Sequence, residues 1–266
     1  MTRIFVHAGF HKTGTTSLQD FMSANRAALA SFCRYYGKTD FLAAGSHARI
    51  YAQRPFAWRL WRFRRSFRAF LDGIEDGGTI VLSRETFSGG MPGHRRLSGG
   101  RMTGYRRAAL PLARVIVAEL RRRFGPDAEI AFVYTTRDRA AWLASVHGHL
   151  LRSIRMTETL DDFRAAQATT PSPEDEAQAM AAHLAPIPVH VLRLEDAAHR
   201  AEGPAAGLLD LLCVPDDVRQ GLKPPRIANS GQDATLRDAF LDLNRSIRDK
   251  RALKKAKEQL LKDSGG

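Results

Sequence analysis

Short, nearly continuous apolar runs alternate along this chain with longer segments of mixed polarity. Runs of this length are typical of parallel strands that are covered on both faces of a sheet. We expect four such strands, at Ile4–Val6, Thr79–Leu82, Ile130–Tyr134 and Val189–Leu192.

The segments between these runs carry hydrophobic residues at helical spacing. The clearest stripe steps by threes and fours from Phe56 to Ile74, and helices are also expected at Val115–Phe124 and Ala140–Leu151. A long helical pattern covers Thr235–Lys262 and ends in Lys-rich turns that we expect to fray. Strands that alternate with helices predict an α/β fold, a three-layer sandwich around a central, mainly parallel sheet.

A chain of 266 residues with 44% hydrophobic residues can bury a large core. We expect a single domain over residues 1–266, with an α/β core at 1–232 and a helical C-terminal extension at 233–266. No apolar run is long enough to span a bilayer, and the N-terminus lacks a signal-peptide core, so we expect a soluble cytoplasmic protein. The two cysteines, Cys33 and Cys213, lack metal-ligand spacing and imply neither a disulfide framework nor a zinc site.

The formal net charge of +13 bears on the partners of the protein. Such an excess suits nucleic acid, an anionic membrane face, an acidic polysaccharide or a highly charged nucleotide. It is equally consistent with an Arg-rich surface that has no special partner, and charge alone does not choose between these.

The first expected strand leads into the stretch GFHKTGTTSL, Gly9–Leu18. Gly9 and Gly14 keep the glycine spacing of a Walker A phosphate loop. The residue after Gly14 is Thr15, however, and the lysine lies two places before Gly14, at Lys12. The loop therefore predicts an anion site, but not the usual nucleoside-triphosphate site.

Backbone N–H groups of this loop and of the helix start would point at a phosphate, and Lys12 would add a positive charge. Four hydroxyl side chains add further donors, those of Thr13, Thr15, Thr16 and Ser17. The alternative is a Gly/Thr turn that only caps the helix, with Thr16 or Ser17 as the N-cap residue.

A second candidate group follows the third expected strand. Arg137 lies at the carboxyl end of that strand, where ligand sites of parallel sheets gather, and Ser145 lies two helical turns later. Arginine offers a bidentate fork for a phosphate, and the serine adds a donor. Taken singly, Arg137 is explained as well by a salt bridge with Asp138 or Glu195, and Ser145 by a small helix residue.

Together these residues resemble the sulfotransferases that use 3′-phosphoadenosine 5′-phosphosulfate (PAPS). The loop is similar to the family's Lys-[ST]-Gly-Thr-[ST] phosphosulfate loop, and Arg137 with Ser145 matches its 3′-phosphate pair. Val191–Asp196 is similar to a strand-end motif of bacterial members, and Arg226–Gly231 loosely resembles the late loop over the nucleotide. Residues 32–110 resemble nothing that we can name.

The resemblance implies a P-loop NTPase-like fold and a site for PAPS. Lys12 would contact the leaving phosphosulfate, Arg137 and Ser145 would hold the 3′-phosphate, and Arg226 would help to close over the nucleotide. The 5′-phosphate would be held by Thr13, Gly14, Thr15, Thr16 and Ser17. No metal is expected, because a lysine beside the bridging oxygen stabilises the leaving group directly.

An acceptor hydroxyl must lose its proton as it attacks, so a base is needed. Glu85, just past the carboxyl end of the second expected strand, is the first candidate, and His11 beside Lys12 is the second. The family's carbohydrate-type members carry a catalytic glutamate in a comparable place. A structural ion pair of Glu85 with Arg84 or another arginine is the alternative.

Two basic segments bear on the acceptor. Residues 54–68 hold six arginines among large aromatics and no acid. They could lie on an anionic membrane, grip an acidic glycan, or bury the aromatics in the core, which we favour. A Gly-rich loop at 88–104, with arginines up to Arg107, is a candidate lid over an anionic acceptor.

The sequence thus favours a PAPS-dependent sulfotransferase that acts on a hydroxyl, of a carbohydrate or a glycolipid that could be anionic. A P-loop kinase or NTPase is an alternative, although the lysine position and the missing Walker B strand argue against it. A basic nucleic-acid-binding module fits the charge but has no recognition motif, so no nucleic-acid partner is expected.

Overall fold

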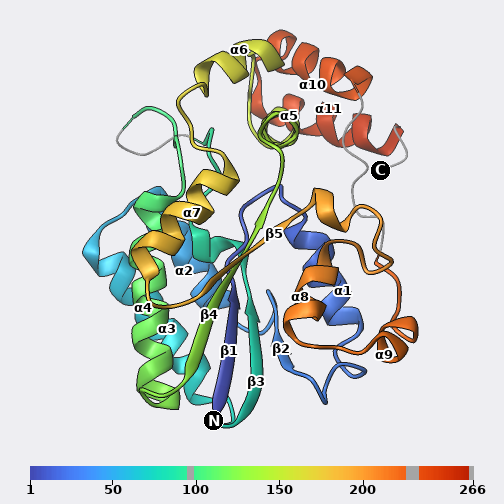
Figure 1. Cartoon of the computed structure of the whole chain (residues 1–266). Coiled ribbons are helices and arrows are strands. Elements are labelled where there is room, and N and C mark those ends of the chain that lie inside the picture. The colour runs from blue at the N-terminus through green and yellow to red at the C-terminus, as the bar shows by residue number, and fades with distance from the viewer. Residues whose placement is uncertain (95–98, 226–233, 264–266) are drawn as a thin grey trace. The chain divides into compact units, whose positions relative to one another are not determined.

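The computed structural model describes residues 1–94, 99–225 and 234–263 (Figure 1). The chain forms two compact units. Unit 1 comprises Met1–Asp138 and Pro171–Ala228, and unit 2 comprises Arg139–Thr170 and Asn229–Gly266. The expected boundary at residue 232 stays a prediction.

Unit 1 contains a five-stranded sheet in the order β2-β3-β1-β4-β5, and every neighbouring pair is parallel. The strands are β1 (Thr2–His7), β2 (Arg34–Tyr36), β3 (Gly78–Ser83), β4 (Glu129–Thr136) and β5 (Val189–Arg193). The four predicted strands are confirmed, and so is the α/β class with a central parallel sheet between helices. The likeness to P-loop NTPases stays a prediction.

Helices cover both faces of this sheet (Figure 1). One side carries α1 (Thr15–Ala24), α8 (Ala206–Leu211) and α9 (Asp216–Gln220). The other side carries α2 (Leu42–Gln53), α3 (Ala57–Asp72), α4 (Arg106–Phe124) and α7 (Pro173–Leu184). Three short 3-10 helices connect them, η1 (Glu85–Ser88), η2 (Glu195–Ala197) and η3 (Gly203–Ala205).

Side chains alternate between the two faces along each strand. Phe5, Val81 and Val133 belong to the cluster that α1 and α8 cover, together with Leu18 and Leu208. Their strand neighbours face the other helical layer and are also fully buried, among them Ile4, Val6, Ile80, Leu82 and Phe132. Burial on both faces explains why these strands read as continuous apolar runs.

Helices α3 and α4 are joined by a buried carboxylate. Glu119 of α4 is fully buried and accepts hydrogen bonds from Arg64, Arg68 and Arg122. Arg122 also pairs with Asp72 at the end of α3. These arginines hold the pKa of Glu119 down to about 2, against the opposing effect of burial. Part of the arginine-rich segment therefore has a structural role.

Unit 2 consists of α5 (Arg139–Ser153), α6 (Leu160–Ala166), α10 (Ala234–Ser246) and α11 (Lys250–Asp263). The last carbonyl groups of α5 are bonded by the C-terminal helices: the Leu151 carbonyl accepts from Asn244 at 3.0 Å and from Lys257 at 2.6 Å. Lys257 also donates to the Ile154 carbonyl at 2.9 Å. A cation at this end of α5 is favourable for the helix dipole as well.

Helices α2, α6, α7, α8 and α9 were not among the expected elements, and the structure differs from the expectations in further places. The edge strand β2 was not predicted. The C-terminal pattern forms two helices rather than one, and the second runs from Lys250 to Asp263. Helix α4 begins at Arg106, nine residues earlier than Val115, and it accommodates Pro111 in its first turns.

None of the helices within the described residues is long and apolar enough to cross a lipid bilayer.

Candidate functional site

The carboxyl ends of all five strands lie at one edge of the sheet, because every pair is parallel. From the central β1 the chain crosses to β2 and β3 on one side and to β4 and β5 on the other. Ligands of open α/β sheets bind beside the point where the strand order reverses in this way. The predicted anion loop leaves β1 at this point.

The loop adopts an unusual backbone conformation. Lys12 has a φ of 69° and Gly14 a φ of 87°, both in the left-handed region. A lysine there is uncommon, and such strained residues cluster at functional sites. Gly14 is the N-cap residue of α1 and makes no side-chain cap, so the alternative with Thr16 or Ser17 as N-cap is wrong.

The start of α1 leaves donors open. The Leu18 N–H bonds the Gly14 carbonyl at 3.1 Å, as the first regular bond of the helix. Among the described residues, no partner bonds the N–H groups of Thr15, Thr16 and Ser17. Such groups carry the positive end of the helix dipole and are suited to an anion.

The threonine hydroxyls of the loop divide into two pairs. Thr13 and Thr15 are buried and donate to the Phe10 carbonyl at 2.7 and 2.9 Å. Both also contact the hydroxyl of Thr135 on β4, at 2.7 and 3.3 Å. Their hydroxyls brace the loop, whereas Thr16 is exposed and Ser17 half-buried. Any hydroxyl contact with a phosphate is therefore expected from Thr16 and Ser17.

Gly9 allows the loop to pack this closely. A Cβ atom at this position would lie 2.6 Å from Thr135 Oγ1, 2.7 Å from His7 Nε2 and 2.9 Å from Thr15 Oγ1. These distances are shorter than any normal contact, so a side chain here would displace the bracing hydroxyls.

A buried polar group beneath the loop was missed by sequence reasoning. His7 Nδ1 lies 2.7 Å from the Ser83 hydroxyl, which also accepts from Gln19 of α1 at 3.2 Å. Burial lowers the pKa of His7 from 6.5 to about 4, so this histidine is neutral at physiological pH. The sequence did contain a signal for this pair, because His7 and Ser83 are the polar last residues of the apolar strands β1 and β3.

Arg137 lies beside the loop. Its Nη1 is 3.5 Å from the Lys12 carbonyl oxygen. Glu195 accepts a hydrogen bond from the Asp138 N–H at 2.8 Å instead of pairing with Arg137, and no carboxylate of the described residues forms a salt bridge with Arg137. The guanidinium is thus a positive charge close to the open amides of α1.

The structure does not test the two remaining predicted nucleotide contacts, Ser145 and Arg226. Ser145 is half-buried on α5, in unit 2, and its pairing with Arg137 stays a prediction. Arg226 lies outside the described residues. Nearby, the Asn25 side chain at the end of α1 bonds both backbone groups of Lys223, at 2.8 and 3.0 Å, and so fixes the chain three residues before position 226.

The two candidate bases, Glu85 and His11, interact electrostatically in unit 1. Burial lowers the pKa of His11, Glu85 opposes this shift, and His94 and Lys12 add to it. The His11 ring stacks on Tyr105, with centroids 6.0 Å apart. Burial also lowers the pKa of His94. Two neutral histidines, a carboxylate and an ammonium group therefore influence one another beside the loop.

Glu85 does not form the ion pair considered as an alternative. The Arg84 side chain instead donates to Thr86 Oγ1 at 3.2 Å and to the Lys38 carbonyl at 3.1 Å. Within the described part of the chain, no salt bridge involves Glu85, which is half-buried.

A cavity of about 190 Å³ adjoins the loop on the β5 side. Thr13, Thr135, Leu194, Pro204 and Gly207 are among the residues that line it. The predicted strand-end motif at 191–196 therefore borders a space next to the loop.

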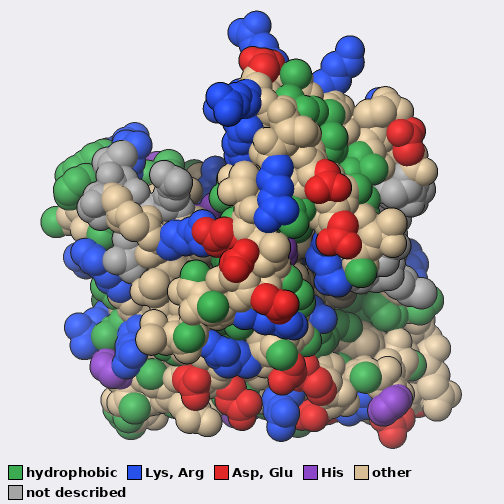
Figure 2. Space-filling model, turned by 90° about the horizontal axis from the view of Figure 1, so that it is seen from above, with side chains coloured by type: hydrophobic (Ala, Val, Ile, Leu, Met, Phe, Trp, Pro, Cys, Tyr) green, Lys and Arg blue, Asp and Glu red, His purple; other side chains and the backbone are tan. Residues whose placement is uncertain are grey.

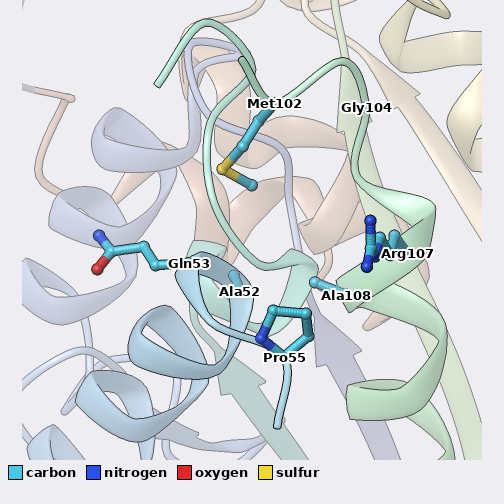
Figure 3. A pocket seen from close by; sticks show the side chains of 7 residues that line it. All are labelled: Ala52, Gln53, Pro55, Met102, Gly104, Arg107 and Ala108. Carbon is cyan, nitrogen blue, oxygen red and sulfur yellow. The ribbon is translucent and has the colours of Figure 1, made fainter. Parts of the chain in front are cut away.

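A smaller cavity, of about 30 Å³, lies between the end of α2 and the start of α4 (Figure 3). Gln53, Pro55, Met102 and Arg107 line it. It holds little more than one water molecule. The predicted lid is closed at its base by bonds from Gly93 N–H to the Met102 carbonyl, 2.9 Å, and from Met102 N–H to the His94 carbonyl, 2.8 Å. Residues 95–98 of this segment lie outside the described residues.

Charged side chains of both signs are spread over one face of the molecule (Figure 2). On the face seen in Figure 2, Lys and Arg side chains are interspersed with Asp and Glu side chains. In the described residues, no group of three or more His, Cys, Asp or Glu side chains is arranged to hold a metal ion. Whether the protein needs a metal stays open to experiment.

No protein-family model matches this chain, and no curated protein sequence is similar to it.

Replacement of Gly9 by alanine should disrupt the loop. The added Cβ collides with three polar atoms of unit 1, so we expect the free energy of unfolding to fall by about 1–3 kcal/mol in urea denaturation. Gly221→Ala is the matched control, because its Cβ meets nothing closer than 3.5 Å. Equal stability of the two variants would contradict the close packing.

His7 should make stability pH-dependent. The unfolded chain binds a proton near pH 6.5 and the native His7 only near pH 4, so the free energy of unfolding falls as pH drops through this window. The contribution is at most about 3 kcal/mol. In urea denaturation at several pH values, His7→Asn should flatten the slope, whereas replacement of the exposed His183 should not. An unchanged slope in His7→Asn would be evidence against a neutral buried histidine.

Proposed function

We propose that this protein is a PAPS-dependent sulfotransferase that acts on a hydroxyl group. The observation that carries the proposal is the set of open amides at the start of α1, with Arg137 beside the loop and Lys12 within it. A doubly anionic nucleotide with phosphates at two ends fits this arrangement of separate positive groups.

Lys12 has the role of stabilising the leaving group. The acceptor oxygen attacks the sulfur of PAPS in line, the bond from sulfur to the 5′-phosphate oxygen breaks, and adenosine 3′,5′-bisphosphate leaves. Negative charge builds on the bridging oxygen, where an ammonium group is most effective. A lysine before Gly14 is a poorer partner for the γ-phosphate of a triphosphate, which supports sulfuryl transfer over a kinase reaction.

The nucleotide contacts follow from the loop. The N–H groups of Thr15, Thr16 and Ser17 bind the 5′-phosphate, assisted by the outward hydroxyls of Thr16 and Ser17. Arg137 binds the 3′-phosphate, with Ser145 and Arg226 as further contacts. The cavity between Thr135 and Leu194 accommodates the nucleoside.

Glu85 is the base that takes the proton of the acceptor hydroxyl. Its support is a half-buried carboxylate without an arginine partner in the described residues, within electrostatic reach of His11 and so of the loop. His11 is the second candidate, because its lowered pKa keeps the ring neutral and able to accept a proton.

The acceptor that we propose is a carbohydrate or a glycolipid. Its support is the carboxylate base in place of a histidine, as in the carbohydrate-type members that the sequence resembles. A cytoplasmic location is part of the proposal, because the free thiols of Cys33 and Cys213 suit a reducing compartment.

Adenosine 3′,5′-bisphosphate should stabilise the protein without Mg²⁺. A saturating ligand raises the melting temperature by on the order of 5 °C for a protein of this size. Arg137→Met should weaken bisphosphate binding by about tenfold to a hundredfold, since it removes a charge-assisted contact. The exposed Arg114→Met is the control. No stabilisation by the bisphosphate, together with stabilisation by ATP and Mg²⁺, would favour a kinase and overturn the proposal.

Lys12 and Glu85 should act on turnover rather than on bisphosphate binding. Labelled PAPS is first screened against pools of polysaccharides, lipids and small phenols to find an acceptor. With that acceptor, we expect kcat to fall by about 10²–10³ in Lys12→Met and by about 10²–10⁴ in Glu85→Gln. Lys38→Met and Glu75→Gln, both at exposed side chains, serve as controls. Full activity of Glu85→Gln would transfer the role of base to His11.

A further inference from the structure

The outer side of α3 and the residues just before it expose large aromatic side chains. Phe56 is 52% exposed, Trp58 52% and Trp61 57%. We call the following set the outer stripe: these three aromatic residues and the neighbouring Arg54, Arg59, Arg62 and Arg65. We expected burial of the aromatics of this segment, and that expectation is wrong for these three.

Helix α3 has two opposite apolar faces. Phe63, Phe67 and Leu71 are fully buried on the core side. Trp58, Trp61, Arg62 and Arg65 follow a spacing of three and four residues and therefore share the other side of the helix. Packing of the core explains the apolar residues on the buried side of α3. It does not explain the tryptophans on the exposed side.

The outer stripe carries positive charge without compensation. Residues 50–68 contain no Asp or Glu. Arg64 and Arg68, on the flank of the helix, are paired with Glu119. Among the described residues no carboxylate pairs with the four arginines of the outer stripe, which contrasts with the pairing on the flank.

Two of the four arginines of the stripe lie against its aromatic rings. The Arg59 guanidinium is 4.6 Å from the Trp58 ring centroid and 5.7 Å from that of Phe56, and Arg65 is 5.7 Å from the Trp61 ring centroid. These two cations thus lie beside an apolar surface, as a headgroup-binding arginine does next to an inserted ring.

We propose that the outer stripe docks on an anionic lipid bilayer. Tryptophan and phenylalanine partition into the boundary between headgroups and acyl chains, while arginines beside them bind lipid phosphates. An acid-free cationic stripe is the complement of an anionic headgroup layer. This surface is independent of the proposed transfer reaction.

The composition of the stripe favours a bilayer over a glycan or a nucleic acid. Residues 54–68 contain no Asn, Asp, Gln or Glu that could accept a hydrogen bond from a sugar hydroxyl. Single-stranded nucleic acid binds in a basic groove that tracks its backbone. The stripe, by contrast, follows the outer side of α3 and the residues just before it, and each of its three rings is about half exposed.

The experiment is co-sedimentation of the full chain with vesicles of phosphatidylcholine, with and without phosphatidylglycerol. We expect binding only to the anionic vesicles, weakening as salt is added. Trp58→Ala/Trp61→Ala should lower the affinity by at least about tenfold. Arg62→Gln should lower it by about fivefold, the value for one arginine at an anionic surface. All three side chains are exposed, and circular dichroism verifies that the variants fold.

Leu42→Ala, at an exposed leucine far along α2, and Arg114→Gln, on α4, are the matched controls and should bind like the unaltered protein. Lack of binding to anionic vesicles would overturn the proposal, and so would equal losses in the controls. Tighter binding to heparin or to an oligonucleotide than to the vesicles, lost in the double tryptophan variant, would assign the stripe to that polymer instead.

Discussion

The hydroxyl cluster beneath the loop is the constraint on which the site depends. Thr13, Thr15 and Thr135 saturate one another and the Phe10 carbonyl, and the absence of a side chain at Gly9 lets them approach. Because the inward-facing hydroxyl groups are bonded within the protein, the loop is held without using the backbone N–H groups at the start of α1. The backbone N–H groups of the first helical turn therefore remain available to a ligand. Water can accept their hydrogen bonds when no ligand is bound.

The cluster also sets the charge pattern around the loop. Buried His7 is neutral and supports the loop through Ser83 without adding charge. The positive charges stand at the rim, where Lys12 and Arg137 flank the open amides. Groups that are held in place in this way would need no rearrangement to bind an anion. The fold thus separates the support of the site from its charged surface.

The sequence predicts this fold well because each central strand is buried on both faces. Such a strand consists of consecutive apolar residues, which can be recognised in the sequence. Strand β2 could not be predicted in this way, because Arg34–Tyr36 is a three-residue edge strand with only one buried side chain. The C-terminal helices share one periodicity, and the break near residue 248 carries no proline or glycine. In the site, sequence spacing located the loop and Arg137. It could not tell which hydroxyls face inward, because Thr13 and Thr15 are distinguished from Thr16 only by contacts with β4.

The arginine cluster around Glu119 has a consequence for the surface of unit 1. With the carboxyl pKa near 2 and arginines that do not deprotonate, Glu119 and its three arginines keep a constant ionisation state over the range in which proteins function. The neighbouring stripe on α3 contains no titratable group other than arginine, and the nearest one on α2 is His47, whose Nδ1 lies 3.0 Å from Ser66 Oγ. Burial and the charge of Arg62 lower the pKa of His47, so this side of the helix keeps the same charge at and above neutral pH, where ionic strength is the variable that modulates its potential.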